Sequence, residues 1–156
     1  MIAEKDFLDF LKIINQHQVN YLVIGGYAMA AHDEPRYTKD LDIWVKPEEE
    51  NSEKVIAAIR EFGFESLKLT KEDFLSSNVF VQIGFAPVRI DVTSDISGIT
   101  FDEAFAGRKL VEVEGIIVPV IGIEALIKNK LASGRLQDMA DVEKLKKVLE
   151  LKKGKK

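Results

Sequence analysis

The sequence predicts an α+β fold, in which helices pack against a mixed β-sheet. Short apolar runs that are typical of buried strands alternate with longer amphipathic stretches that are typical of helices. Two pairs of these runs are separated only by short turn signals, Ala86-Pro87 and Glu114-Gly115, which predict antiparallel hairpins. Helices combined with antiparallel hairpins are typical of this fold class. Because 156 residues suit one hydrophobic core, we expect residues 1–156 to form a single domain.

The first half of the chain is expected to contain three helices and two strands. Apolar residues recur at helical spacing over residues 4–17 and predict an amphipathic helix there. A buried strand over residues 20–24 is followed by a helix over residues 27–32, a strand over residues 41–45 and a helix over residues 47–62. The last of these helices begins with Pro47 and three glutamates, which suit a first turn, and it ends at Gly63.

The second half is expected to contain both hairpins and three further helices. The predicted strands cover residues 78–85, 88–93, 108–113 and 116–120, and the predicted helices cover residues 101–106, 123–132 and 137–151. Ser133 and Gly134 separate the last two helices, because glycine is common at helix ends. Trp44 and Phe85 lie within apolar strand runs, so we expect both in the core rather than on a surface that stacks against bases.

The composition excludes several classes of protein. The chain has no cysteine, which rules out disulfides, thiol nucleophiles and cysteine-ligated zinc. Its two histidines, His17 and His32, leave little room for a histidine-rich metal site. The net charge of −4 argues against general nucleic-acid binding. No apolar run approaches the roughly 18 residues that span a membrane, and the charged N-terminus does not fit a signal peptide, so we expect a cytoplasmic protein.

Two aspartates on one predicted strand are the strongest functional signal. Asp40 and Asp42 are two residues apart, so the alternation of a strand places both side chains on one side, roughly 7 Å apart along it. Carboxylates this close repel each other unless a proton or a cation lies between them. A divalent cation bound through phosphate oxygens would meet that requirement. The alternative interpretation is that the two aspartates cap turns or lie on an exposed strand edge.

A third carboxylate would be needed to complete a metal site with this pair, and Asp91 is the best candidate. Asp91 lies within an apolar strand run, where an acidic residue is unusual unless its face of the strand has a special role. Asp95 is the competing candidate, but it follows the apolar run in a loop sequence, so we favour Asp91. Arg89 and Thr93 are expected to share the face of Asp91 by alternation.

Two glycines end the first predicted strand and begin the helix that follows. Gly25 and Gly26 allow the backbone to approach a phosphate closely, and the start of a helix offers unpaired N–H groups and a positive dipole end. A plain tight turn is the alternative for a glycine pair taken alone. Its spacing to Asp40 strengthens the functional interpretation.

These motifs together resemble the signature of the DNA polymerase β-like nucleotidyltransferase superfamily. The matching features are the Gly25-Gly26 turn, the string Arg36-x-Thr38-x-Asp40-x-Asp42 and the later Asp91. Within this superfamily the chain is most similar to minimal nucleotidyltransferases of the AbiEii and MNT type, many of which are toxin–antitoxin components. The resemblance covers residues 21–92 and, more weakly, residues 130–145. It implies a nucleotidyltransferase-like mixed sheet and an NTP-dependent enzyme that releases pyrophosphate.

The resemblance also implies roles for individual residues. Asp40, Asp42 and Asp91 would bind two Mg²⁺ ions, and Asp91 would also accept the proton of the attacking hydroxyl. The expected nucleotide-binding residues are Gly25, Gly26, Arg36, Thr38 and Lys130. Arg36 is equally suited to pair with Asp40 or Asp42, and Lys39 is expected to be an exposed charge. Lys130 would reach the triphosphate, whereas the residues that follow it in the same element, Arg135, Asp138 and Asp141, are expected to form a structural ion-pair network.

Two classes of function remain open at this point. The first is an enzyme that moves an NMP from an NTP such as ATP to a hydroxyl on RNA, on a partner protein or on a small molecule. A toxin–antitoxin system with a cognate partner protein is the context expected from resemblance alone. The second is a non-enzymatic nucleotidyltransferase-like module for binding or regulation, against which the intact carboxylates argue. A nuclease or phosphatase that uses the same acids is a third idea, and the predicted exposed helix faces would permit a homodimer.

Overall fold

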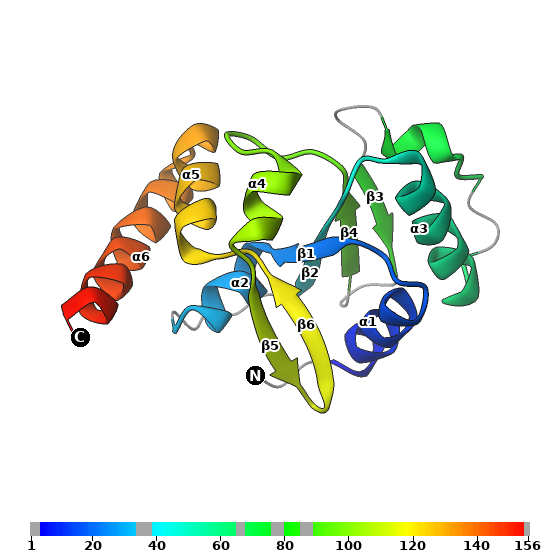
Figure 1. Cartoon of the computed structure of the whole chain (residues 1–156), viewed down its shortest axis with the longest axis horizontal. Helices are drawn as coiled ribbons and strands as arrows, with labels where there is room; N and C mark the ends of the chain where they lie inside the picture. Colours follow the sequence, from blue (N-terminus) through cyan, green and yellow to red (C-terminus); the bar gives the residue numbers. More distant parts are fainter. Residues whose placement is uncertain (1–3, 34–38, 65–67, 76–79, 85–88, 155–156) are drawn as a thin grey trace.

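A computed structural model of the chain describes residues 4–33, 39–64, 68–75, 80–84 and 89–154. Within these residues a mixed sheet has the strand order β3-β4-β2-β1-β6-β5 (Figure 1). The strands are β1 (Tyr21–Ile24), β2 (Asp40–Val45), β3 (Phe80–Ile83), β4 (Arg89–Thr93), β5 (Lys109–Val113) and β6 (Ile116–Val120). The helices are α1 (Lys5–Gln16), α2 (Gly25–Ala31), α3 (Glu49–Glu61), α4 (Phe101–Ala106), α5 (Ile123–Ser133) and α6 (Leu136–Gly154). The predicted combination of helices with a mixed sheet is confirmed.

Antiparallel and parallel pairing are combined in this sheet. The β3–β4, β5–β6 and β1–β2 pairs are antiparallel, whereas β2 pairs with β4, and β1 with β6, in parallel. Both predicted hairpins are therefore confirmed, although the Ala86-Pro87 turn lies outside the described residues. In the second hairpin Glu114 and Gly115 have φ angles of 47° and 83°, as the two central residues of a type I′ turn do.

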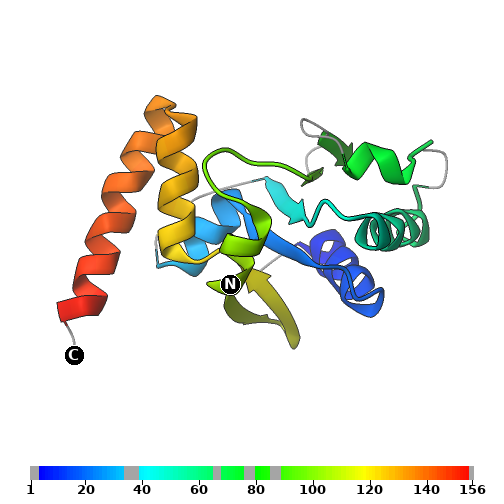
Figure 2. The ribbon, with the colours of Figure 1, turned by 45° about the horizontal axis from the view of Figure 1, so that its top comes forward.

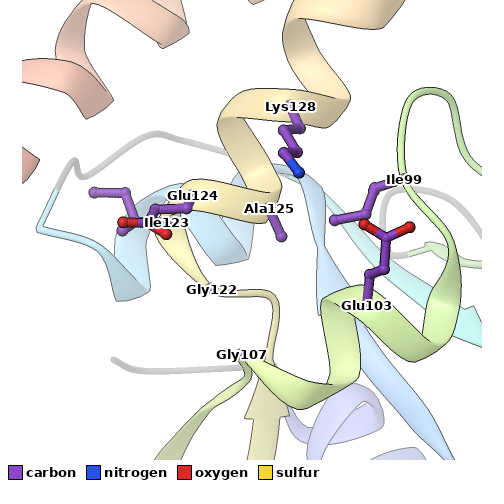
Figure 3. A pocket seen from close by; sticks show the side chains of 8 residues that line it. All are labelled: Ile99, Glu103, Gly107, Gly122, Ile123, Glu124, Ala125 and Lys128. Carbon is purple, nitrogen blue, oxygen red and sulfur yellow. The ribbon is translucent and has the colours of Figure 1, made fainter.

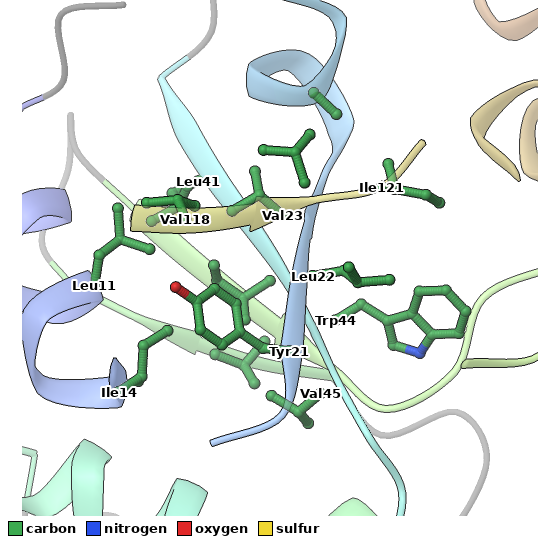
Figure 4. Close-up of a cluster of buried hydrophobic side chains, with 14 of the residues drawn as sticks. Leu11, Ile14, Tyr21, Leu22, Val23, Leu41, Trp44, Val45, Val118 and Ile121 are labelled. Atoms are coloured by element: carbon green, nitrogen blue, oxygen red, sulfur yellow. The ribbon is translucent and has the colours of Figure 1, made fainter. Parts of the chain in front are cut away.

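Apolar side chains from the central strands form a core against α1. Leu11 and Ile14 of α1 point towards Tyr21 of β1, with Val118 of β6 close by (Figure 4). Each of these side chains is almost completely removed from solvent. The burial of this apolar surface is the main driving force for folding.

The opposite face of the sheet is partly covered by α4. Trp44 of β2 packs edge to face against Phe101 of α4, with the ring centroids 5.2 Å apart. Only 1% of Trp44 is exposed, so its predicted place in the core is confirmed, whereas Phe85 lies outside the described residues. Beyond α4, α5 and α6 run side by side at the end of the molecule opposite to α3 (Figure 2).

Several element boundaries differ from the prediction for local physical reasons. Helix α2 begins at Gly25 rather than residue 27, so both glycines belong to its first turn. Helix α3 begins at Glu49, because Glu48 is still extended and acts as the N-cap, which leaves Pro47 before the helix. A short 3-10 helix over Lys71–Phe74 was not predicted, and a capping box between Thr70 and Asp73 stabilises its start. No described helix is long and apolar enough to cross a membrane.

Candidate active site

Parallel pairing of β2 with β4 brings two of the predicted carboxylates side by side. Asp42 lies directly opposite Asp91 in this register, and Asp40 lies opposite Arg89. Residues that face each other across paired strands project from the same face of the sheet. Asp40, Asp42 and Asp91 therefore share the face that also carries Trp44, and Arg89 and Thr93 lie on it as well. Asp95 lies beyond the end of β4 and is exposed.

The surroundings of Asp42 are unfavourable for its charge. Burial, together with the negative charges of Asp91 and Asp40, raises the pKa of Asp42 to about 7. A side-chain hydrogen bond between Asp42 and Asp91 contributes in the same direction, because the protonated Asp42 carboxyl can donate to its neighbour. The positive charge of Lys130 acts against this rise. The negative charges around Asp42 therefore exceed the positive charge that the protein places near them.

The first turn of α2 is in direct contact with Asp42. Gly25 follows β1 with φ at +72°, a left-handed conformation that side chains rarely adopt. A Cβ atom built onto Gly25 would collide with the carboxylate of Asp42. The register explains this contact, since Ile24 of β1 lies opposite Asp42 of β2. Glycine is therefore required at position 25 for two reasons: its backbone conformation and the absence of a Cβ atom next to Asp42.

Substitution Gly25→Ala is expected to damage the site and the fold together. The left-handed conformation costs a non-glycine residue about 1–2 kcal/mol, so we expect the free energy of unfolding to fall by at least that amount. The new methyl group would also displace Asp42, and we expect turnover to fall about a hundredfold. Chemical denaturation and a transfer assay would measure the two effects. Gly63→Ala is the control, because Gly63 also has a positive φ of 112° but nothing within 4 Å of a built Cβ; full activity in both variants would contradict the prediction.

A residue that the sequence did not reveal lies on the other side of Asp91. Gln82 of β3 faces Asp91 in the β3–β4 hairpin, and its Nε2 atom donates a hydrogen bond to Asp91 Oδ1 at 3.1 Å. Predicting this contact requires the register of the hairpin, whose turn lies outside the described residues. The one signal in the sequence was a polar residue in an otherwise apolar strand.

Lys130 lies in a buried ion network between α5 and α6. Its Nζ atom is 2.9 Å from Asp141 Oδ2 and 3.4 Å from Asp138 Oδ1, and 6% of the residue is exposed. Arg135 Nε and Ser133 Oγ both donate to Asp138 Oδ2. Burial acts to raise the pKa of Asp138, but these hydrogen bonds and the charges of Lys130 and Arg135 together hold it below its usual range. The Asp42 carboxylate contributes to raising the pKa of Arg135, after the larger effects of Asp138. Within this paired network, the positive charge of Lys130 acts on Asp42.

The remaining sequence candidates have mixed outcomes. Arg36 and Thr38 lie outside the described residues. Lys39 is exposed, as expected. His32 is the C-cap of α2 and is buried, with Nε2 at 2.7 Å from the carbonyl oxygen of Ile121, and burial lowers its pKa. These contacts indicate a structural role for His32.

The donor chemistry of the carboxylates suits a hard divalent cation, although the described residues contain no group of three acidic or histidine side chains arranged around a common point. Carboxylate oxygens are the ligands that Mg²⁺ prefers. Asp42 and Asp91 are instead hydrogen-bonded to each other, at a position where negative charge is in excess. A cation would relieve the repulsion that raises the pKa of Asp42.

A separate cavity of about 290 Å³ lies between α4 and the first turn of α5. Glu103 of α4 and Lys128 of α5 line it from opposite sides (Figure 3). Its walls include Gly107 and Gly122, whose backbones approach so closely that a Cβ on Gly122 would collide with the Gly107 carbonyl. None of the three carboxylates lines this cavity.

The fold matches those of solved nucleotidyltransferase structures. A candidate nucleotidyltransferase from Thermotoga maritima is 21% identical over 96% of each chain, with a TM-score of 0.58. The lincosamide antibiotic adenylyltransferase LnuA, with lincomycin bound, is 16% identical over 94% of this chain and 98% of its own, with a TM-score of 0.61. ANT(2″)-Ia in complex with adenylyl-2″-tobramycin is 16% identical over 94% and 89%, with a TM-score of 0.60. At these identities the likeness shows the fold.

The family is shown by the sequence itself. A family model described as "Nucleotidyl transferase of unknown function (DUF2204)" matches residues 3–155, and the chain belongs to this family. The protein is therefore a nucleotidyltransferase, and the resemblance to a minimal member of that class is confirmed. No curated protein matches the sequence.

Proposed function

We propose that the protein transfers a nucleoside monophosphate from an NTP to a hydroxyl acceptor and releases pyrophosphate, with divalent metal bound by Asp40, Asp42 and Asp91. The observation that carries this proposal is the pairing of Asp42 with Asp91 directly beside the Gly25 turn. That arrangement puts excess negative charge next to a backbone that a triphosphate can approach closely. Family membership supports the class of reaction.

Two Mg²⁺ ions, when bound, would supply charge neutralisation for the triphosphate and would acidify the attacking hydroxyl. The residues proposed to hold them are Asp42 and Asp91, with Asp40 next to them on β2. Asp91 is also the proposed acceptor of the hydroxyl proton. Its neighbour Gln82 occupies one of its two oxygens, which leaves the other for the site.

The donor nucleotide is proposed to lie on the β1 side of the carboxylates. Gly25 and Gly26 form the first turn of α2 there, and Gly25 lets the backbone come close to Asp42. We propose that the positive charge of Lys130 attracts the triphosphate to this side. The ammonium group of Lys130 is paired with Asp138 and Asp141, but its charge still acts against the rise in the pKa of Asp42. Arg36 and Thr38 keep their proposed roles in binding the nucleotide on resemblance alone.

The acceptor remains one of three chemical classes: RNA, a partner protein or a small molecule. The names of two structural neighbours show that their acceptors are antibiotics, lincomycin for one and tobramycin for the other. A small hydroxylated molecule is therefore included among the proposed acceptors. A toxin–antitoxin context and a cognate partner protein remain proposals that rest on the sequence resemblance.

A transfer assay would test this function. The protein is incubated with each α-labelled NTP and Mg²⁺, alone and with total RNA, cell lysate, lincomycin or tobramycin. We expect label to appear in one acceptor class together with stoichiometric pyrophosphate, and to disappear when EDTA removes the metal. Label transfer that persists in EDTA would contradict the role of metal. Release of phosphate, or cleavage of the RNA, in place of pyrophosphate would contradict the proposed transfer.

A further inference from the structure

We propose that Gln82 is a positioning residue, which holds the Asp91 carboxylate in the orientation that metal binding and proton acceptance require. This inference rests on the proposed function of the carboxylates. It assigns a task to an exposed side chain on an edge strand, which no sequence motif includes.

The hydrogen bond between Gln82 and Asp91 follows from the sheet register. Strand β3 is antiparallel to β4, and Gln82 lies directly opposite Asp91, so both side chains leave the same face. The Nε2 atom of Gln82 is 3.1 Å from Asp91 Oδ1, within the range of an amide–carboxylate hydrogen bond. Only 9% of Asp91 is exposed, whereas Gln82 is an exposed residue, so the glutamine reaches inward from the rim of the sheet.

Asp91 therefore lies between two different neighbours on adjacent strands. Asp42 on β2 faces one side and Gln82 on β3 faces the other. A carboxylate can rotate about its terminal bond, and a donor on one oxygen limits that rotation. The hydrogen bond from Gln82 to Oδ1 therefore limits the orientation in which the Asp91 carboxylate faces Asp42.

The chemistry of glutamine suits this task better than the alternatives at the same position. A lysine or arginine would neutralise Asp91 and compete with a cation for it. A glutamate would add a further negative charge and could not donate while ionised. Asparagine is one methylene shorter, and an apolar residue has no donor. A neutral amide of this length orients the carboxylate and leaves the net charge of the site unchanged.

Replacement Gln82→Met tests the proposal, because methionine has a similar length and cannot donate. We measure Mn²⁺ binding to the full chain by electron paramagnetic resonance without nucleotide, and kcat and KM in the transfer assay. Partners of metal ligands typically contribute 10–100-fold, so we expect the Kd for Mn²⁺ to rise about tenfold and kcat to fall about tenfold, with KM for the NTP changed less than about twofold. Gln16→Met is the matched control, since Gln16 is an exposed glutamine at the end of α1.

The outcomes separate this inference from the proposed function. Unchanged Mn²⁺ affinity and kcat in folded Gln82→Met would overturn the inference and leave the proposed function standing. A wild-type protein that neither binds Mn²⁺ nor transfers label would overturn both. Gln82→Asn provides a second variant: it keeps a polar side chain on the strand but shortens its reach, and we expect the same losses. Equal thermal unfolding of all variants would show that the losses do not come from the fold.

Discussion

Replacement of Asp42 with asparagine is expected to reduce kcat about a thousandfold while the protein stays folded. Asp42 is the central one of the three carboxylates, opposite Asp91 on the next strand and in contact with Gly25 on the other side. Asparagine keeps the shape of the side chain but removes the negative charge that a divalent cation needs. Loss of about 4 kcal/mol of charge stabilisation in the transition state corresponds to this factor. Steady-state kinetics with Mg²⁺ and the identified acceptor would measure it.

The matched control for this experiment is Asp95→Asn. Asp95 is an aspartate a few residues from Asp91, but it is exposed and lies past the end of β4. We expect less than a twofold change in kcat for this variant, because Asp95 lies outside the β2–β4 register that pairs Asp42 with Asp91. Equal activity of Asp42→Asn and the wild type would show that the reaction does not depend on this site.

The metal-free protein is expected to become less stable as the pH rises from about 4 to about 8. Burial and the charges of Asp91 and Asp40 raise the pKa of Asp42 from an ordinary 3.8 to about 7 in the folded state. The folded protein therefore holds this proton in a range where the unfolded chain has released it. The stabilisation that comes from the proton on Asp42 is fully present below the pKa of Asp42 in the unfolded chain. It is lost as the pH rises through about 7, where Asp42 ionises in the folded protein. The shift corresponds to on the order of 4 kcal/mol of unfolding free energy.

Urea denaturation across this pH range, in EDTA, would measure the effect as the difference between wild type and Asp42→Asn. The difference is needed because two other groups act in the opposite direction: His32 and Asp138, whose pKa values are both lowered, contribute stability that is lost as the pH falls. We expect Asp42→Asn to be the more stable protein at about pH 8, and its advantage to disappear at about pH 4. Added Mg²⁺ should stabilise the wild type at the higher pH and leave the variant unchanged. A difference that does not vary with pH would show that Asp42 has an ordinary pKa.

Much of the fold could be predicted because its signals are local. Short apolar runs predicted the strands, and the turn signals at Ala86-Pro87 and Glu114-Gly115 predicted the two antiparallel pairs. Alternation also predicted that Asp40 and Asp42 project from one face. The proximity of Asp91 came from resemblance, since periodicity does not show which strands pair in parallel.

The parts that could not be predicted depend on register and on burial. The contact between Gly25 and Asp42, and the hydrogen bond from Gln82 to Asp91, arise only when three strand pairs are aligned. An ion-pair network of Arg135, Asp138 and Asp141 was predicted, but the sequence did not reveal that Lys130, which was expected to reach a phosphate, is buried within it. Electrostatic compensation of this kind depends on distances in three dimensions.

The parallel pairing of β2 with β4 has a consequence for how the protein is made. Asp42 and Asp91 are about 50 positions apart in the sequence, and closing a loop of that length has an entropic cost that local pairs avoid. A nascent chain that has emerged only as far as β2 therefore contains Asp40 and Asp42 but not Asp91. The cluster of negative charge arises only once β4 has left the ribosome and docked beside β2. A ribosome-bound fragment that ends before β4 therefore lacks the paired carboxylates of Asp42 and Asp91.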